Sequence, residues 1–390
     1  MIYIFGSDET GIHYLLDNVF ILLNIITLFL IIIEKLATEK FVLNKSTAIS
    51  LTLLCWVISQ SILNTIYSGR LIIPSSLFLS LLTFIIIVAG VKTGREFNVA
   101  IWSFIVGAFF SAIIPLVLYP EVIGTRISEY QGVHYSGGLW NSVLKSFVSS
   151  GWLILALLQK YKKKKIVFVF GLTSFTVIWL GAFAGLSRSF LLLTIISIIV
   201  YLFSSKAIKK YIQFFLFSII IILIILNFMP QVIKGILNRL DHTIGNTSDE
   251  PRLMIWAAYL ENYREYFLVG AMGNFMDYGP NLYPHPPHST YINYFVQYGV
   301  LGIITFLALL TNTFKNIFLI KRLDATQFSM LLAWFSAYII QISISETGYA
   351  DVSFYVGLAF VTIWKQFLVP EKELIDFEEQ SSHTSHFKKY

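Results

Sequence analysis

The stretch from Pro284 to Gly302 reads Pro-His-Pro-Pro-His-Ser-Thr-Tyr-Ile-Asn-Tyr-Phe-Val-Gln-Tyr-Gly-Val-Leu-Gly. Its first half is polar and stiffened by proline, whereas its second half opens a long apolar run. Proline suits the approach to a helix but not its interior, so a helix is predicted to start near His288. At about 100° per residue, the positions on one stripe of that helix are His288, Ile292, Phe295, Gly299 and Gly302. The two glycines would let a neighbouring helix approach closely and hold the histidine at the membrane surface.

His288 at this helix start has the chemistry of a proton acceptor. The positive end of a helix dipole disfavours a second positive charge, so the imidazole is predicted to stay neutral. A neutral imidazole is the state that a general base needs. The alternative interpretation is an interfacial histidine that only caps a helix.

Composition predicts an all-α, polytopic integral membrane protein. The chain has 390 residues, of which 56% are hydrophobic and 13% charged, and its mean hydropathy is +0.72. Its apolar residues come in blocks too long for the core helices of a soluble domain. The single cysteine, Cys55, excludes an internal disulfide and a cysteine-based zinc site. The net charge of +6 comes from lysines between apolar blocks, where they set topology, so no nucleic-acid partner is expected.

The apolar blocks and the basic loops between them predict the topology. The candidate spans are 17–33, 46–66, 71–91, 97–119, 141–159, 166–186, 189–204, 211–229, 289–311, 327–345 and 352–369. Every second connection is rich in lysine and arginine, which is typical of cytoplasmic loops. The pattern predicts about eleven spans, with ten to twelve allowed, an outer amino terminus and an inner carboxyl terminus.

This topology divides the chain into four parts. Residues 1–229 form a first set of transmembrane helices, 230–288 a large outer loop, 289–369 the last transmembrane helices, and 370–390 a cytoplasmic tail. The outer loop is too long to be a passive connection. Within it, two acidic residues before Pro251 signal a helix start, and 252–266 has helical patterning. The residues predicted to share the apolar face of that helix are Leu253, Trp256 and Leu260.

Two arginines are predicted on the same outer side as His288. Arg188 lies in a tight turn between two spans, and Arg252 lies in the first turn of the loop helix. The planar fork of a guanidinium group suits a phosphate or pyrophosphate. The alternatives are that Arg188 snorkels to lipid headgroups and that Arg252 stacks on Trp256.

Three features resemble the O-antigen ligase and polymerase superfamily. His288-Ser289, nine residues, Gly299, two residues and Gly302 match its signature of His, then Asn, Ser or Gln, nine residues, Gly, two residues, and Gly, Thr or Tyr. Arg188 in a short outer turn resembles a second family feature. The third is an arginine that opens a helix of the large loop, followed by Trp and Gly-x-x-Gly-Asn-Phe, here Arg252, Trp256 and 270–275. The resemblance covers roughly 160–310, whereas the first 120 residues match only in hydropathy.

The resemblance implies a metal-independent glycosyltransferase without a cofactor. It would act on oligosaccharides carried by undecaprenyl diphosphate in the bacterial inner (cytoplasmic) membrane, with the active site facing the periplasm. His288 would deprotonate the acceptor hydroxyl, and Arg188 and Arg252 would hold the diphosphate as it leaves. The anomeric centre would be inverted. The expected partners are the lipid-linked oligosaccharide, the lipid bilayer and a chain-length regulator.

Four further residues are candidates for supporting roles. His285 competes with His288 for the substrate-facing position, although only His288 has the downstream glycine spacing. Ser289 belongs to the signature, and Glu346 in a late outer loop could orient His288 or bind sugar hydroxyls, or simply be hydrated. Tyr291 could stack on a sugar or belong to the aromatic belt. No carboxylate cluster completes a metal site with the two histidines, so no metal is expected.

Within the superfamily, a polymerase is favoured over a ligase. The outer loops other than 230–288 are short, and no strongly basic outer patch is present for an anionic lipid A core. The alternatives are a ligase that transfers the glycan to lipid A core or another final acceptor, and a lipid-linked oligosaccharide flippase. A flippase should carry charges deep in its spans, where Lys145 is the main candidate.

Overall fold

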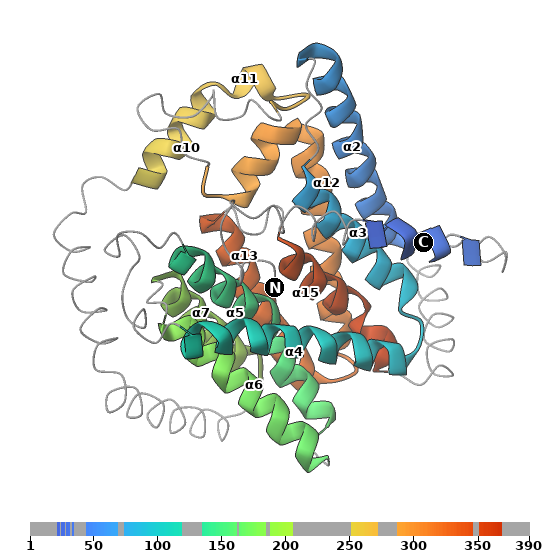
Figure 1. Ribbon diagram of the computed structural model, residues 1–390, viewed down its shortest axis with the longest axis vertical. Helices are drawn as coiled ribbons and strands as arrows, with labels where there is room; N and C mark the ends of the chain where they lie inside the picture. The colour runs from blue at the N-terminus through green and yellow to red at the C-terminus, as the bar shows by residue number, and fades with distance from the viewer. Residues whose placement is uncertain are drawn as a thin grey trace, which may run out of the picture.

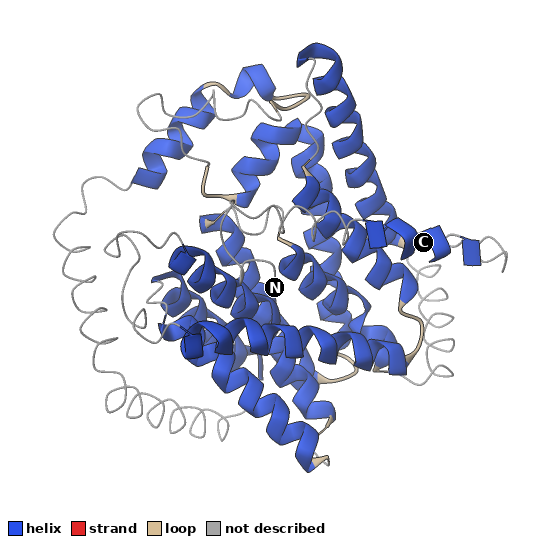
Figure 2. Cartoon of the chain, in the orientation of Figure 1, coloured by secondary structure: helices blue, strands red, loops and turns tan. Residues whose placement is uncertain are grey.

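The chain folds into a bundle of helices. The structure, a computed structural model, describes residues 44–68, 74–118, 135–161, 164–184, 188–205, 251–271, 287–345 and 351–368, together with parts of 22–34. Every regular element within these ranges is helical (Figure 2). The predicted all-α class is therefore confirmed.

The helices are labelled as in Figure 1. They are α2 Lys45–Ser68, α3 Ser75–Gly90, α4 Gly94–Leu118, α5 Tyr135–Lys160, α6 Lys165–Ala184, α7 Arg188–Ser205, α10 Pro251–Glu261, α11 Tyr263–Tyr266, α12 Thr290–Ile320, α13 Ala325–Ile344, α15 Val352–Ile363 and the 3-10 helix η5 Trp364–Phe367. The helix predicted over 252–266 is present as α10 and α11, with a break at Asn262.

Several of these helices have the length and composition of membrane spans. Among the described residues, the five that are long and apolar enough are Lys45–Leu63, Gly94–Ile114, Lys165–Phe183, Thr290–Ile320 and Ala325–Ile344. The shorter apolar helices are Ser76–Gly90, Phe147–Lys160, Leu192–Ser205 and Val352–Phe367. All of them coincide with predicted blocks, which confirms a multi-pass membrane protein. The predicted span 211–229 lies outside the described residues, and the count of eleven stays a prediction.

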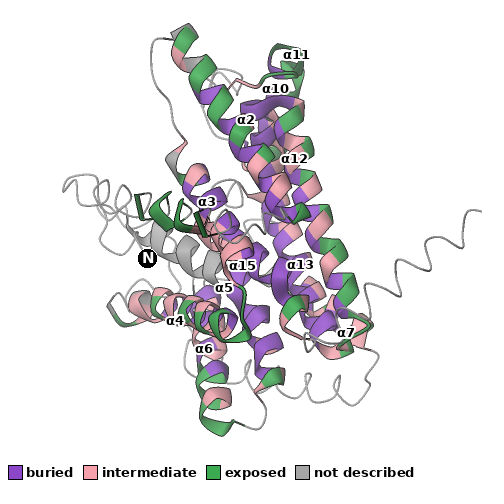
Figure 3. Ribbon diagram, turned by 90° about the vertical axis from the view of Figure 1, so that its right-hand side faces the viewer, coloured by how far each residue is buried: buried purple, intermediate pink, exposed green. Residues whose placement is uncertain are grey.

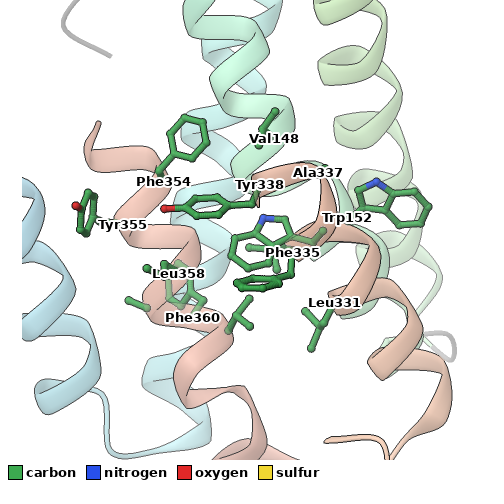
Figure 4. Close-up of a cluster of buried hydrophobic side chains, with 14 of the residues drawn as sticks. Val148, Trp152, Leu331, Phe335, Ala337, Tyr338, Phe354, Tyr355, Leu358 and Phe360 are labelled. Atoms are coloured by element: carbon green, nitrogen blue, oxygen red, sulfur yellow. The ribbon is translucent and has the colours of Figure 1, made fainter. Parts of the chain in front are cut away.

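The centre of the bundle is formed by α13, which packs against α5, α7 and α12. Its side chains interdigitate with those of α15 and α5 in an aromatic-rich cluster (Figure 4). Trp334 is fully buried and donates from Nε1 to the carbonyl oxygen of Ser149, at 3.2 Å. A Cβ at Gly357 would lie 2.9 Å from the same oxygen, so glycine allows α15 to approach α5 closely. Such close packing is what holds helices together in lipid, which is as apolar as they are.

Many residues on the outer faces of the bundle are exposed (Figure 3), and many of these are large and apolar. Ile166 is 86% exposed and Phe203 is 81% exposed. Apolar residues on the outside and smaller or aromatic residues inside are the arrangement expected of a protein solvated by lipid.

The segment Pro251–Ala271, which we call the platform, lies at one end of the bundle, above the start of α12 (Figures 1 and 3). The predicted apolar face of α10 is not the side of the helix that packs against α12. Ile255 and Tyr259 are buried and Trp256 is half-buried, whereas Leu253 and Leu260 are exposed. α10 is apolar on two opposite sides, so its periodicity alone could not identify the side that packs against α12.

Candidate functional site

Residues 290–302 of this stretch form the first arm and the bend of a helical hairpin and not a straight helix. Gly299 has φ 64° and ψ −164°, which interrupts α12 and separates a first arm, 290–298, from a second arm, 300–320. The rings of Tyr294 and Phe306 stack with their centroids 4.3 Å apart. In a straight helix these residues would be separated by about 18 Å along the axis. The chain therefore reverses direction at Gly299.

The predicted single stripe through His288, Gly299 and Gly302 is consequently wrong. A Cβ at Gly302 would overlap the Cβ of Tyr298, so this glycine lets the two arms close on each other. A Cβ at Gly299 would lie 2.5 Å from the carbonyl oxygen of Leu268 in the platform. Gly302 thus permits close approach of the first arm, and Gly299 permits close approach of the platform. The sequence predicts a neighbouring transmembrane helix in both places.

The backbone groups that the reversal removes from the helix find other partners. The carbonyl of Val296 accepts from the amide of Ala271 at 2.7 Å, and the amide of Val300 donates to the carbonyl of Phe267 at 2.7 Å. The carbonyl of Tyr298 accepts from Trp56 Nε1 of α2 at 2.8 Å. Because unpaired backbone groups are costly away from water, these bonds fix the hairpin to the platform and to α2.

His288 lies just before the hairpin, in an uncommon backbone conformation. Its φ of 50° is the positive value that few residues other than glycine adopt. Such a conformation costs about 1–3 kcal/mol and persists only where the surroundings enforce it. The helix begins at Thr290, two residues later than predicted, with Ser289 in the N-cap position. The histidine side chain is half-buried.

The neighbours of His288 are anchored on both sides. On one side, the carbonyl of the buried Pro287 accepts from Trp256 Nε1 of α10 at 2.6 Å. On the other side, the amide and the hydroxyl of Thr290 both donate to the carbonyl of Ser345, at 3.1 and 2.9 Å. The platform and the end of α13 therefore hold the segment that carries His288.

Arg252 lies on the platform near this segment. It is one helical turn before Trp256, and positions four apart lie on the same face of a helix, with Cβ atoms about 5–6 Å apart. The Trp256 bond to Pro287 ties this helix to the segment that carries His288. Arg252 is exposed in the first turn of α10.

The other predicted residues are placed less completely. Arg188 is the first residue of α7, which packs along α13, but its side chain lies outside the described residues. His285 and Glu346 also lie outside them. Tyr291 is half-buried, interacts with the Ser343 side chain of α13, and has its ring centroid 6.1 Å from that of Phe306. This is a packing position between α13 and the second arm.

Beneath the first arm lies a buried set of polar side chains that the sequence analysis did not single out. The hydroxyls of Tyr294 and Tyr355 are hydrogen-bonded to each other. Gln297 Nε2 donates to Asn293 Oδ1 at 2.7 Å, and both side chains are buried. The spacing of Asn293 and Gln297 by one turn in an apolar block was the available signal. Within the described ranges, no three His, Cys, Asp or Glu residues are grouped as metal ligands.

The platform is itself held together by a tyrosine. The hydroxyl of the buried Tyr266 in α11 donates to the carbonyl of Tyr259 in α10. Burial, together with the neighbouring Tyr259, raises the pKa of Tyr266 to about 12. The hydroxyl therefore stays protonated, and remains a donor, throughout the neutral pH range.

Replacing Trp256 by phenylalanine is expected to loosen the platform from the His288 segment. The change keeps most of the ring but removes the donor to Pro287, a loss of about 1 kcal/mol in unfolding free energy. Thermal unfolding and limited proteolysis of the platform in detergent would measure it. The matched control is Trp179→Phe, because Trp179 packs against the rings of Phe183 and Phe190 at 5.5 and 5.6 Å. Equal protease sensitivity of the two variants would contradict the role of the Trp256 bond.

Comparison with known protein families finds a match in the part of the chain that contains these residues. The family model described as O-antigen ligase matches residues 172–307. The matched range includes Arg188, the platform and the hairpin as far as Leu307. A search of curated proteins gives no match. Residues 172–307 of this chain are therefore similar to the O-antigen ligase family.

Proposed function

We propose that the chain is a polymerase of surface polysaccharide in the bacterial inner membrane, with its active site facing the periplasm. It would transfer a glycan en bloc from undecaprenyl diphosphate to the non-reducing end of another lipid-linked repeat unit. The observation that supports this proposal best is the anchoring of His288. The histidine is held at φ 50°, between a carbonyl bonded to the Arg252 helix and an amide bonded to α13.

The proposed reaction needs one proton acceptor and positively charged groups that neutralise the negative charge of the leaving group. The acceptor hydroxyl gives its proton to a ring nitrogen of His288 while its oxygen forms a bond to the anomeric carbon. The bond from that carbon to the diphosphate oxygen breaks, and its electron pair leaves with undecaprenyl diphosphate. Attack in line with the leaving group inverts the anomeric centre. General-base catalysis of this kind contributes about 10²–10⁴-fold in rate.

Arg188 and Arg252 would stabilise the leaving diphosphate. A lipid diphosphate leaves readily once its negative charge is balanced, and a guanidinium fork can donate two parallel hydrogen bonds to it. Both residues fall within the range matched by the family model. Arg252 lies one turn before Trp256, which ties α10 to the His288 segment.

Changing either arginine to lysine is expected to lower transfer by about 10–100-fold, since a charge-assisted hydrogen bond contributes about 1.5–3 kcal/mol and a point charge cannot reproduce the fork. The assay is the rate of transfer from a lipid-linked repeat unit. The control is Arg264→Lys, at an exposed arginine of the same platform whose guanidinium lies 5.9 Å from the Tyr263 ring centroid. If both test variants match this control, neither arginine contacts the diphosphate.

A ligase is the second candidate, because the matched family model is described as O-antigen ligase. The two activities differ in acceptor, and a deletion strain separates them. Loss of a polymerase leaves a single repeat on the final acceptor, whereas loss of a ligase leaves none. Repeat units trapped on the cytoplasmic side would instead indicate a flippase and overturn both candidates.

A further inference from the structure

α10 is apolar on two opposite sides, although it lies in the segment predicted to be an outer loop. One side, with Ile255 and Tyr259, is buried against α12. On the other side, Leu253 is 61% exposed and Leu260 is 48% exposed. Their spacing of seven residues, with Ala257 between them, places them on one stripe. A helix that is apolar all round is normally surrounded by apolar material, so the exposed stripe needs a neighbour.

The turn that follows α11 presents three more large apolar side chains. Phe267, Leu268 and Val269 are 41%, 66% and 47% exposed. Their backbone is fixed, because Phe267 accepts from the amide of Val300 and the carbonyl of Leu268 occupies the space that a Cβ at Gly299 would need. These side chains are therefore held outward by a rigid turn.

The second arm of α12 exposes a lipid-facing stripe that begins at this turn. Leu301, Ile304 and Leu307 are 47%, 54% and 43% exposed, and they belong to a candidate membrane span. From Val300 to the charged end at Lys321, the arm extends about 32 Å at 1.5 Å per residue. That length matches the hydrocarbon core of a bilayer, which is about 30 Å thick. The outer edge of the hydrocarbon therefore falls near Val300, next to Phe267.

α2 also exposes apolar side chains at this level and beyond it. Trp56 is bonded to Tyr298, at the tip of the hairpin. Beyond Trp56, α2 exposes a stripe formed by Ile58, Ile62 and Ile66, which are 40%, 54% and 71% exposed. The candidate span of α2 continues past this contact to Leu63. Both helices beside the turn thus face lipid at the level of the turn or beyond it.

From this continuity we infer that the platform is embedded in the membrane interface, with its exposed apolar side in contact with phospholipid. The residues concerned are Leu253, Leu260, Phe267, Leu268 and Val269. The apolar stripe of the platform then lies among the upper acyl chains, as in interfacial amphipathic helices. Membrane contact holds whether or not the chain transfers sugars. If the proposed function holds as well, Arg252 stands in the layer where the diphosphate of a lipid-linked donor lies.

Spin labels at single cysteines test this placement in liposomes. In a Cys55→Ala background, labels are attached to Leu268→Cys and, separately, to Leu253→Cys. The lipid reference is Ile304→Cys on the second arm, and the water reference is Glu265→Cys, at an exposed acidic position of α11. Collision rates are measured with oxygen, which concentrates in lipid, and with a water-soluble nickel chelate.

The labels on the platform are expected to have collision rates like those of the lipid reference, Ile304→Cys. Collision with nickel at Leu268 and Leu253 should be at least fivefold lower than at Glu265, with oxygen collision as high as at Ile304. Nickel collision equal to that at Glu265 would mean that the apolar side faces water and would overturn the inference. Protection from both reagents would mean that a protein surface covers it, which also overturns it. Because two positions are labelled separately, the second still tests the inference if one variant does not fold.

Discussion

Replacing His288 by alanine should abolish transfer of the lipid-linked glycan while leaving the protein inserted and folded. The expected loss is at least about 10²–10⁴-fold, the contribution of a positioned general base. The assay is glycan chain length in cells and transfer rate with the purified protein. Because His288 has φ 50°, alanine adds backbone strain to the loss of the imidazole.

A second substitution separates these two effects. Asparagine tolerates positive φ better than most residues, so His288→Asn should keep the thermal stability of the wild type and still lack the base. We expect His288→Asn to be as inactive as His288→Ala. Activity of the asparagine variant within about tenfold of the wild type would remove the imidazole from the mechanism and leave His288 with a conformational role.

Replacing Gly299 by alanine should cost more stability than any other single change in the hairpin. Its φ of 64° with ψ of −164° lies in a region that only glycine occupies readily. A Cβ would lie 2.5 Å from the carbonyl oxygen of Leu268 and 2.9 Å from the amide nitrogen of Val269. Both atoms belong to the backbone of a turn whose flanking residues are hydrogen-bonded, at Phe267 and Gly270, so neither moves cheaply. The expected loss is about 3 kcal/mol or more in unfolding free energy.

The matched control is Gly107→Ala, in the interior of α4. A Cβ there has no heavy atom within 4 Å. Alanine favours a helix interior over glycine by about 1 kcal/mol, so this variant should melt at or above the wild-type temperature. The two variants are compared by thermal unfolding in detergent. If Gly299→Ala melts together with Gly107→Ala, the reversal at Gly299 is not a feature of the folded protein.

Hydropathy was sufficient to predict most of the fold. Blocks of apolar residues of span length coincide with the membrane helices that the structure describes, because in lipid a helix satisfies its own backbone. The loop helix was predicted from local chemistry as well, since acidic residues followed by proline mark a helix start, and α10 begins at Pro251.

The hairpin could not be predicted from the same patterns. Ile292, Phe295, Gly299 and Gly302 have the spacing of one helix face, so the sequence is equally compatible with a continuous helix. Only the backbone at Gly299 shows the reversal. The bond from Trp256 to Pro287 joins residues 31 apart in the chain, and no local pattern encodes it.

The side of α10 that packs against α12 could not be predicted for a related reason. The helix is apolar on two sides, one of which contacts α12 while the other is exposed. A rule that assigns apolar residues to the core cannot tell which of two apolar sides packs against the protein. The distinction requires knowing which medium, lipid, water or protein, lies beside the exposed side of the helix, and the labelling experiment measures this.

The central claim is that the anchored histidine catalyses glycosyl transfer from a lipid diphosphate. The direct measurement is reaction of the purified protein with a lipid-linked repeat unit, with and without a chelator and with and without a core acceptor. The account predicts products longer than one repeat on the lipid carrier, formed equally in the presence of chelator and absent with His288→Asn. Products that form only on the core acceptor would identify a ligase. No glycan transfer to either acceptor by well-folded wild-type protein would contradict the account.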